Sequence, residues 1–282
     1  MINYYLITKP GIILGNLITV AAGFLLASKG HLDLGLFLET LLGLALVMAS
    51  ACVFNNYIDQ PIDKKMERTK NRALVTGAIS GKQAIMFAVL LGLLGILVLF
   101  LYTNLLTVLV AAIGFFVYVV LYSFWKCHTI YGTAIGSIAG AVPPVVGYCA
   151  VSNRFDLGAL ILFGMMVLWQ MPHFFAIAMY RFNDYVAAGI PVLPAKKGFL
   201  RTKIHMLLYI LAFIFVAALL TFFDYTGNVY LAVTLIFGFA WLALCLKGFT
   251  TNNDKRWGWE MFRLSLVLIS TMCFVIPFDI AG

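Results

Sequence analysis

The chain has 282 residues and a net charge of +8, yet only 11% of its residues are charged and 63% are hydrophobic. Its mean hydropathy is +1.01, whereas soluble domains carry about 25% charged residues. This composition excludes a soluble globular protein. The excess positive charge therefore indicates basic loops at a membrane surface. We expect no nucleic-acid partner, since the sequence contains no zinc-finger spacing or similar motif.

Nine apolar runs follow one another along the chain, and each approaches the roughly 20 residues that a helix needs to cross a bilayer. The N-terminal segment lacks a charged start followed by a small-residue cleavage site, so we expect no cleaved signal peptide. The predicted fold is an all-α polytopic membrane bundle of nine transmembrane helices, forming a single domain over residues 1–282. The predicted spans are 10–28, 34–56, 83–102, 105–124, 131–150, 157–180, 205–223, 227–247 and 261–280.

Lys and Arg residues fall almost entirely on one side of this predicted bundle. If the N-terminus lies inside, 17 of the 19 face the inner side, and only Lys29 and Arg154 face the outer side. Positive loop charge marks the cytoplasmic face of a membrane protein. The sequence thus predicts an integral membrane protein with a cytoplasmic N-terminus and an outward-facing C-terminus.

Two of the inner loops are long. Residues 57–82 follow the second span and residues 181–204 follow the sixth, so the long loops recur four spans apart. This recurrence predicts a duplicated four-helix unit, about residues 10–124 and 131–247, followed by the final span at 261–280.

The first long loop begins with oxygen-bearing side chains at regular spacing. Asn55, Asp59 and Asp63 are four residues apart, which places them along one face if the helix continues. Pro61 ends or kinks the helix near this point. Mg²⁺ takes one or two carboxylates and completes its shell with water and substrate phosphates. The pattern therefore predicts a Mg²⁺ site at the inner end of the second span.

Basic residues follow these carboxylates directly. Arg68, Lys70 and Arg72 alternate along the loop, and they could converge on a polyanion only from irregular backbone. Carboxylates for a metal beside cations for phosphate suit a Mg²⁺–diphosphate complex. Cytoplasmic loops are rich in Lys and Arg in any case. If only the basic residues are considered, an ordinary solvated loop explains them equally well. Asn55 and Asp59 lie at the end of an apolar helix, where such groups are usually functional.

The second long loop repeats this chemistry at the equivalent place. Asp184 lies just beyond the sixth span, Arg181 precedes it, and Lys197 follows. Gly189, Pro191 and Pro194 break regular structure between them, as a loop that covers a site requires. The repetition on the same side predicts that both loops face one ligand.

Two further residues are open to more than one interpretation. Lys126 ends the fourth span, where it either reaches the same anion or anchors the helix end beside Trp125. His173 lies inside the sixth span. An intramembrane histidine can be a hydrogen-bonded core residue, a proton relay or a haem-iron ligand, and the first is the most common.

At these motifs the sequence resembles a known family. NNYIDQPID, followed by KKMERTKNR, is similar to the first aspartate-rich motif and basic tail of the UbiA-type intramembrane prenyltransferases. The segments ERTKNRAL, WQMPHFFAIAMYR and DYVAAGIPVLP point more narrowly to the haem-farnesylating branch of that superfamily. The resemblance extends over the whole chain and its nine spans, and it implies a UbiA-like bundle in the inner membrane of a bacterium.

The resemblance also implies an activity: transfer of a farnesyl group from farnesyl diphosphate to a vinyl group of haem b, with addition of water, to give haem O. Membrane lipid surrounds such an enzyme, and a downstream haem enzyme such as a terminal oxidase is the expected recipient of its product. Mg²⁺ is the implied cofactor. The implied metal ligands are Asn55, Asp59, Asp63 and Asp184, of which the three aspartates are catalytic. The implied diphosphate-binding residues are Arg68, Lys70, Arg72, Lys126, Arg181 and Lys197, and His173 is a candidate haem-binding residue.

The sequence departs from the superfamily pattern at two positions. Asn56 stands where many relatives have Asp, and Ala188 stands where the second motif often has its second Asp. This thinner carboxylate set is compatible with either one or two Mg²⁺ ions.

Three other functions are alternatives to this activity. The nearest is a prenyltransferase of the same superfamily acting on a quinone precursor such as 4-hydroxybenzoate. A membrane carrier would place its polar site near the bilayer midplane, whereas these carboxylates lie at helix ends. A haem-binding oxidase subunit leaves Asp59 and Asp63 without a role.

Overall fold

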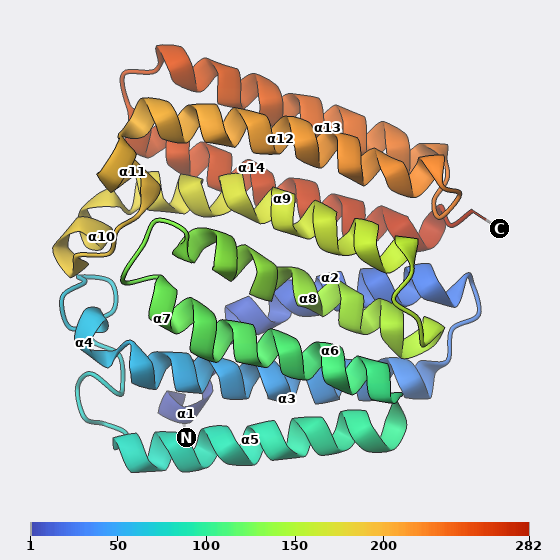
Figure 1. The fold of residues 1–282 in the computed structure, drawn as a ribbon, viewed down its shortest axis with the longest axis horizontal. Helices are drawn as coiled ribbons and strands as arrows, with labels where there is room; N and C mark the ends of the chain where they lie inside the picture. The colour runs from blue at the N-terminus through green and yellow to red at the C-terminus, as the bar shows by residue number, and fades with distance from the viewer. Residues whose placement is uncertain (1, 282) are drawn as a thin grey trace.

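The computed structural model describes residues 2–281, and it is an all-α bundle (Figure 1). Among the described residues, nine helical segments are long and apolar enough to span a membrane, as the sequence predicts. The nine segments are α2 (Pro10–Ser28), α3 (Leu34–Ile58), α5 (Gly81–Tyr102), α6 with its continuation to Trp125 (Leu105–Trp125), α8 (Gly132–Ser152), α9 (Leu157–Tyr180), α12 (Phe199–Phe222), α13 with its continuation to Thr250 (Asn228–Thr250) and α14 with its continuation to Phe278 (Asp254–Phe278).

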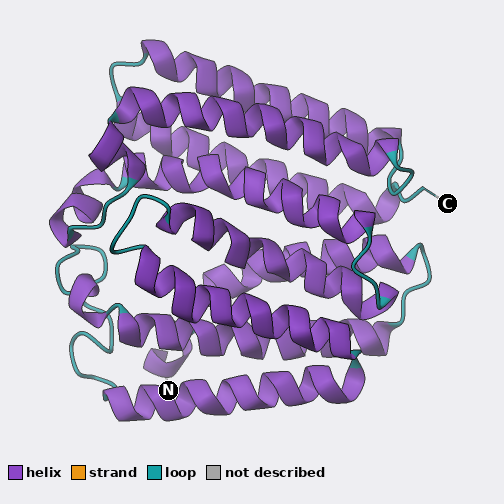
Figure 2. Cartoon of the chain, viewed as in Figure 1, coloured by secondary structure: helices purple, strands orange, loops and turns teal. Residues whose placement is uncertain are grey.

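Loops join these helices at both ends of the bundle (Figure 2). Polar residues in the loops fix where several helices begin. The Asp33 carboxylate accepts a hydrogen bond from the Leu36 amide at the start of α3, and Ser80 and Gln83 form a reciprocal capping box at the start of α5. Asn104 caps α6 in the tight turn after α5. Without these caps, the first amide groups of α3, α5 and α6 would lack hydrogen-bond partners at the membrane boundary.

The seventh and ninth spans begin earlier than the apolar runs suggest. α12 begins at Phe199, six residues before the predicted start at 205, and α14 begins at Asp254, seven residues before 261. These first turns carry charged residues, which a count of apolar residues leaves out. Lys203 Nζ lies 2.6 Å from an Asp254 carboxylate oxygen, so the added turns of α12 and α14 are joined by an ion pair.

Two of the helices pack at backbone contact distance. A Cβ atom added to Gly23 in α2 would collide with the Pro144 carbonyl oxygen in α8, and one added to Gly147 in α8 would collide with the Val20 carbonyl oxygen in α2. In a membrane the attraction between helices comes from close packing, which small residues permit. These glycines therefore set the spacing of α2 and α8.

The remaining helices are short and belong to the loops. α1 (Ile2–Ile7) precedes α2, α4 (Gln60–Asp63) follows α3, and α10 (Phe182–Ala188) and α11 (Leu193–Lys197) follow α9. Figure 1 shows α4, α10 and α11 at the same end of the bundle, opposite the C-terminus. The ends of the second and sixth spans thus share one end of the molecule.

Candidate functional site

The polar end of α3 begins with Asn55, which is buried and has partners on three sides. Lys9 Nζ donates to Asn55 Oδ1 at 2.7 Å, and the Tyr118 hydroxyl donates to the same oxygen at 3.4 Å. Asn55 Nδ2 donates to Ser123 Oγ at 3.3 Å. The amide is therefore fixed with its oxygen toward cationic and hydroxyl donors.

Tyr118 and Ser123 reach Asn55 because the fourth span contains a π-helical segment. This segment is η1 (Val117–Tyr122), and it runs into the short α7 (Ser123–Trp125). Such wide turns occur frequently at functional sites. The Tyr118 and Tyr122 rings stack with centroids 5.6 Å apart, so both face the end of α3 together.

Asp59 lies at the junction between α3 and α4, and its charge is matched by Lys126. Lys126 Nζ lies 2.5 Å from Asp59 Oδ1 and 2.6 Å from Oδ2. The same ammonium group lies 4.9 Å from the centre of the Tyr122 ring, within range of a cation–π interaction. Oδ1 is buried, and the Lys126 ammonium group is the cation beside it.

Asp63, in α4, is buried and pairs with Arg72. Arg72 NH1 donates to Asp63 Oδ2 at 2.7 Å and to Asn56 Oδ1 at 3.0 Å. The Thr69 hydroxyl donates to the Asp63 carbonyl and holds the intervening loop in a compact turn. Pro61 occupies the first turn of α4, where its missing amide hydrogen costs nothing.

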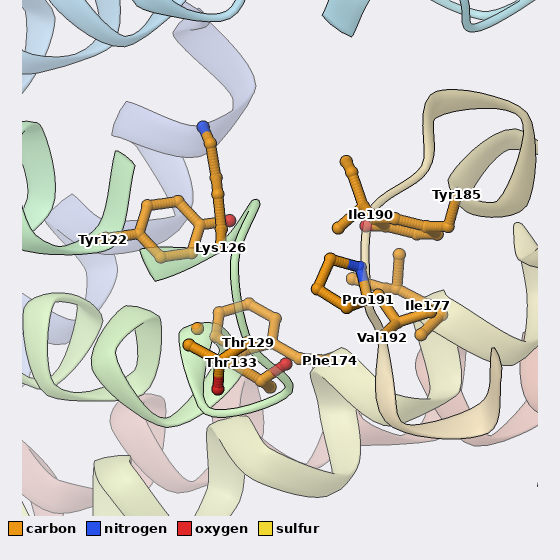
Figure 3. Close-up of a pocket in the computed structure, with 12 residues that line it drawn as sticks. Tyr122, Lys126, Thr129, Thr133, Phe174, Ile177, Tyr185, Ile190, Pro191 and Val192 are labelled. Atoms are coloured by element: carbon orange, nitrogen blue, oxygen red, sulfur yellow. The ribbon is translucent and has the colours of Figure 1, made fainter. Parts of the chain in front are cut away.

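Figure 3 shows a cavity between the ends of the fourth and sixth spans. Its volume is about 80 Å³, and Tyr122 and Lys126 face Tyr185 and Ile190 across it, with Phe174 between them. Lys126 is the residue that pairs with Asp59, and Tyr185 is the neighbour of Asp184 in the chain. The two motifs therefore border one space.

Tyr185 also marks where the two long loops approach one another. Burial raises the pKa of the Tyr185 phenol to about 12, and the nearby Tyr122 ring adds to that increase. The Arg68 guanidinium of the first loop is close enough to oppose it. The Arg68 side chain thus lies near Tyr185 of the second loop.

A larger cavity, of about 330 Å³, lies under α1 on the other side of the first motif. It is bordered by Lys9, Arg68 and Arg72, and also by Asn56 and Asp63. Lys9 has a left-handed backbone conformation, with φ 56° and ψ 61°, at the joint between α1 and α2. Withdrawal of its ammonium group from water lowers the pKa of Lys9 to about 8.

The family model described as "UbiA prenyltransferase family" matches residues 16–267. The chain belongs to this family. It is 62% identical to the "Protoheme IX farnesyltransferase" of Protochlamydia amoebophila over the full length of both chains. It is 52% identical to the protein of the same name from Edwardsiella ictaluri, covering 98% of this chain and 94% of that protein.

Solved structures of the UbiA family share the fold at lower identity. A digeranylgeranylglyceryl phosphate synthase aligns with a TM-score of 0.80 and 18% identity, covering 98% of this chain and 96% of that one. A UbiA homologue from Archaeoglobus fulgidus "bound to GPP and Mg2+" aligns with a TM-score of 0.72 and 14% identity, covering 98% and 99%. These alignments establish the nine-helix UbiA fold for the chain.

The structure groups some of the residues expected to bind diphosphate and leaves others at the surface. Lys126 and Arg72 contact the first-motif carboxylates, and Arg68 borders the larger cavity. Lys70 is exposed and pairs with Glu67 at 2.6 Å. Arg181 stacks over the Tyr180 ring at 4.4 Å, and Lys197 is exposed. The roles of these residues toward diphosphate stay predictions.

The four expected metal ligands do not form a closed cluster. Within residues 2–281 no group of three or more His, Cys, Asp or Glu side chains has the geometry to hold a metal ion. Asp59 and Asp63 each face a cation, and Asp184 is half-buried in α10. Carboxylate and amide oxygens nevertheless suit Mg²⁺, which needs few protein ligands when phosphates complete its shell.

His173 is buried in α9 and contacts α14. Its Nδ1 lies 2.7 Å from Ser265 Oγ, while that hydroxyl donates its only hydrogen to the Phe262 carbonyl at 2.6 Å. Nδ1 must then carry the hydrogen of the neutral ring, which leaves the lone pair on Nε2. Iron-binding histidines use this arrangement, and so do histidines of a packed core. A haem-binding role stays a prediction.

Sequence reasoning left Lys9 and Ser123 out of the site. The only signal for Lys9 is its place before Pro10, at the start of the first span, where a basic residue would pass for an interfacial anchor. Ser123 could not be placed because its position depends on the π-helical register of η1, which has no clear sequence pattern. Both residues became visible only from their contacts with Asn55.

Proposed function

We propose that this enzyme transfers a farnesyl group from farnesyl diphosphate to a vinyl group of haem b. The main support is the 52–62% identity, over nearly full length, to proteins named protoheme IX farnesyltransferase. The new bond joins the first farnesyl carbon to the terminal vinyl carbon, and the allylic C–O bond to diphosphate breaks. Water adds to the remaining vinyl carbon and releases a proton, which gives haem O and diphosphate.

Asn55, Asp59, Asp63 and Asp184 would hold Mg²⁺ at the inner end of the bundle. The buried Asp59 carboxylate and the oxygen-only donor set support this assignment. When bound, Mg²⁺ neutralises charge that develops on the departing diphosphate. The named solved relative "bound to GPP and Mg2+" shares the fold and supports the same cofactor here.

The basic residues of the two loops complete the leaving-group site. Arg72 and Lys126 already lie beside the first motif, and Arg68 borders the larger cavity. Donors fixed where charge develops lower a barrier more than donors that must reorient. Lys70, Arg181 and Lys197 add positive charge farther out.

Aromatic side chains border the space next to this charge. Tyr122, Phe174 and Tyr185 line the cavity shared by the two motifs. Their ring faces stabilise a neighbouring carbocation, and their bulk keeps water from it until the new bond has formed. The apolar helices beyond would receive the farnesyl tail and the macrocycle, with the haem propionates toward the basic end.

The inner end of the bundle lies in the cytoplasm, and the C-terminus lies outside. Seventeen of the 19 Lys and Arg residues support this orientation. The product would then pass within the membrane to a downstream haem enzyme such as a terminal oxidase.

A choice of acceptors tests the proposed function. Purified protein receives farnesyl diphosphate, Mg²⁺ and an equimolar mixture of haem b and 4-hydroxybenzoate. We expect farnesyl to appear on the haem alone. Farnesylated 4-hydroxybenzoate as the main product would instead make the chain a quinone-precursor prenyltransferase.

A further inference from the structure

The first motif has a feature that the proposed reaction does not by itself require. Each of its three expected metal ligands contacts a different protein cation. Lys9 Nζ lies 2.7 Å from Asn55 Oδ1. Lys126 Nζ lies 2.5 Å from Asp59 Oδ1. Arg72 NH1 lies 2.7 Å from Asp63 Oδ2. Together they use the oxygens that a metal ion would need.

The Lys9 contact is the most informative of the three pairs. Asn55 is neutral, so it needs no cation for charge balance, and yet an ammonium group is directed at its oxygen. Lys9 also adopts the left-handed backbone region, which is unfavourable for a residue with a side chain. The Asn56 amide donates to the Ile7 carbonyl at 2.7 Å and so fixes the end of α1 immediately before this joint. The fold thus aims Lys9 at the motif.

From these contacts we propose that Lys9, Lys126 and Arg72 hold the metal ligands in the free enzyme and transfer to phosphate oxygens when Mg²⁺ and diphosphate arrive. Lys9 is the member of this set that no motif assigns. The proposal rests on the proposed function, because it takes Mg²⁺ and a prenyl diphosphate as ligands of this site.

Charge balance explains why the two ligands should enter together. Three cations and two carboxylates leave one net positive charge on these five side chains. A divalent metal alone would add to that charge and would compete with Lys9 for Asn55. A diphosphate group carries about three negative charges near neutral pH and accepts the displaced cations. Each ligand therefore favours the other, and by reciprocity the same factor acts on both affinities.

The larger cavity gives two of the transferred cations, Lys9 and Arg72, a common destination, whereas Lys126 borders the smaller cavity. Lys9, Arg68 and Arg72 all border its 330 Å³. Arg68 has no ion pair among the described residues, so it can meet a phosphate without first breaking another contact.

Metal binding without substrate tests this exchange directly. Mn²⁺ serves as the probe, and its free signal in electron paramagnetic resonance reports binding to the purified full-length protein. Wild-type protein should bind Mn²⁺ weakly alone and at least tenfold more tightly with farnesyl thiolodiphosphate, an unreactive analogue. Lys9→Met should bind Mn²⁺ alone several-fold more tightly than wild type and bind the analogue several-fold more weakly.

Opposite shifts in the two affinities separate exchange from a structural role. A misfolded variant would bind both Mn²⁺ and the analogue more weakly. Lys9→Arg keeps the positive charge, so its Mn²⁺ binding should stay as weak as that of the wild type. Lys82→Met removes an exposed charge from the same end of the bundle and should change neither affinity. If Lys9→Met does not fold, Lys126→Met tests the same exchange at Asp59, with the same pair of opposite shifts.

Unchanged or weaker Mn²⁺ binding by a folded Lys9→Met protein would overturn the exchange. Farnesyl transfer to haem b could still proceed in that case, so the proposed function would survive. Absence of Mn²⁺ binding to the wild type, both with and without the analogue, would overturn the exchange together with the metal site.

Discussion

At the scale of single residues, Asp63 carries the clearest consequence. It is buried, and among residues 2–281 its one ion pair is with the Arg72 guanidinium. Asp63→Asn keeps the shape and one hydrogen-bonding oxygen, so the protein should still insert and fold. It removes a negative charge needed near the metal, and we expect the rate of farnesyl transfer to fall by about 100-fold.

Steady-state rates at saturating Mg²⁺ measure this loss. Glu67→Gln is the matched control, because Glu67 is an exposed carboxylate of the same loop whose only ion pair among residues 2–281 is with Lys70. Activity close to wild type in Asp63→Asn would refute a metal role for this residue.

His173 offers a second test at the residue scale. Its Nδ1 hydrogen is directed at Ser265, which places the lone pair on Nε2. If Nε2 binds haem iron, His173→Ala should shift the Soret band of the haem-loaded protein. His128→Ala, on an exposed loop, should leave the band unchanged. If the Soret band is the same in His173→Ala and wild type, His173 is not a haem ligand and has only a packing role.

At the scale of helices, α2 and α8 depend on glycine. Gly23→Ala would force the new methyl group into the Pro144 carbonyl oxygen, which belongs to the backbone and cannot rotate away. We expect a loss of about 1–3 kcal/mol in stability. Thermal unfolding in detergent measures it. Gly15→Ala is the control on the same helix, since nothing lies within 4 Å of that position, and an equal loss there would contradict the packing argument.

Helix boundaries show how far the sequence alone can be taken. Apolar runs located all nine spans because hydrocarbon requires long uninterrupted segments. The same criterion placed the start of α12 six residues late and that of α14 seven residues late, because their first turns are charged and are stabilised by tertiary contacts such as the Lys203–Asp254 pair. Hydropathy reports burial in lipid and not the continuation of a helix into the interface.

The site itself was predicted in part. The spacing of Asn55, Asp59 and Asp63 identified the motif, and the repeat at Asp184 identified the second loop. The break between α3 and α4 then turns Asp63 toward Arg72 while Asp59 faces Lys126, which spacing on an ideal helix does not reveal. The Lys9 contact joins residues 46 positions apart and could come only from the fold.

At the scale of the whole molecule, the charge distribution makes a prediction about orientation. Alkaline phosphatase, which is active only outside the cytoplasm, should be active when fused after the final span. The same reporter fused within residues 64–80 should be inactive, because those residues lie at the basic end of the bundle. The opposite pattern would invert the proposed topology and place the motifs on the outer face.

The central claim is that the basic end of this bundle carries out Mg²⁺-dependent farnesyl transfer to haem. The mass of the haem recovered after incubation of the purified protein with farnesyl diphosphate and haem b tests it most directly. With Mg²⁺ present, the haem should gain one farnesyl group and one hydroxyl group, and with a chelator it should gain nothing. Haem of unchanged mass in the presence of Mg²⁺, or an equal gain in the chelator, would contradict the account.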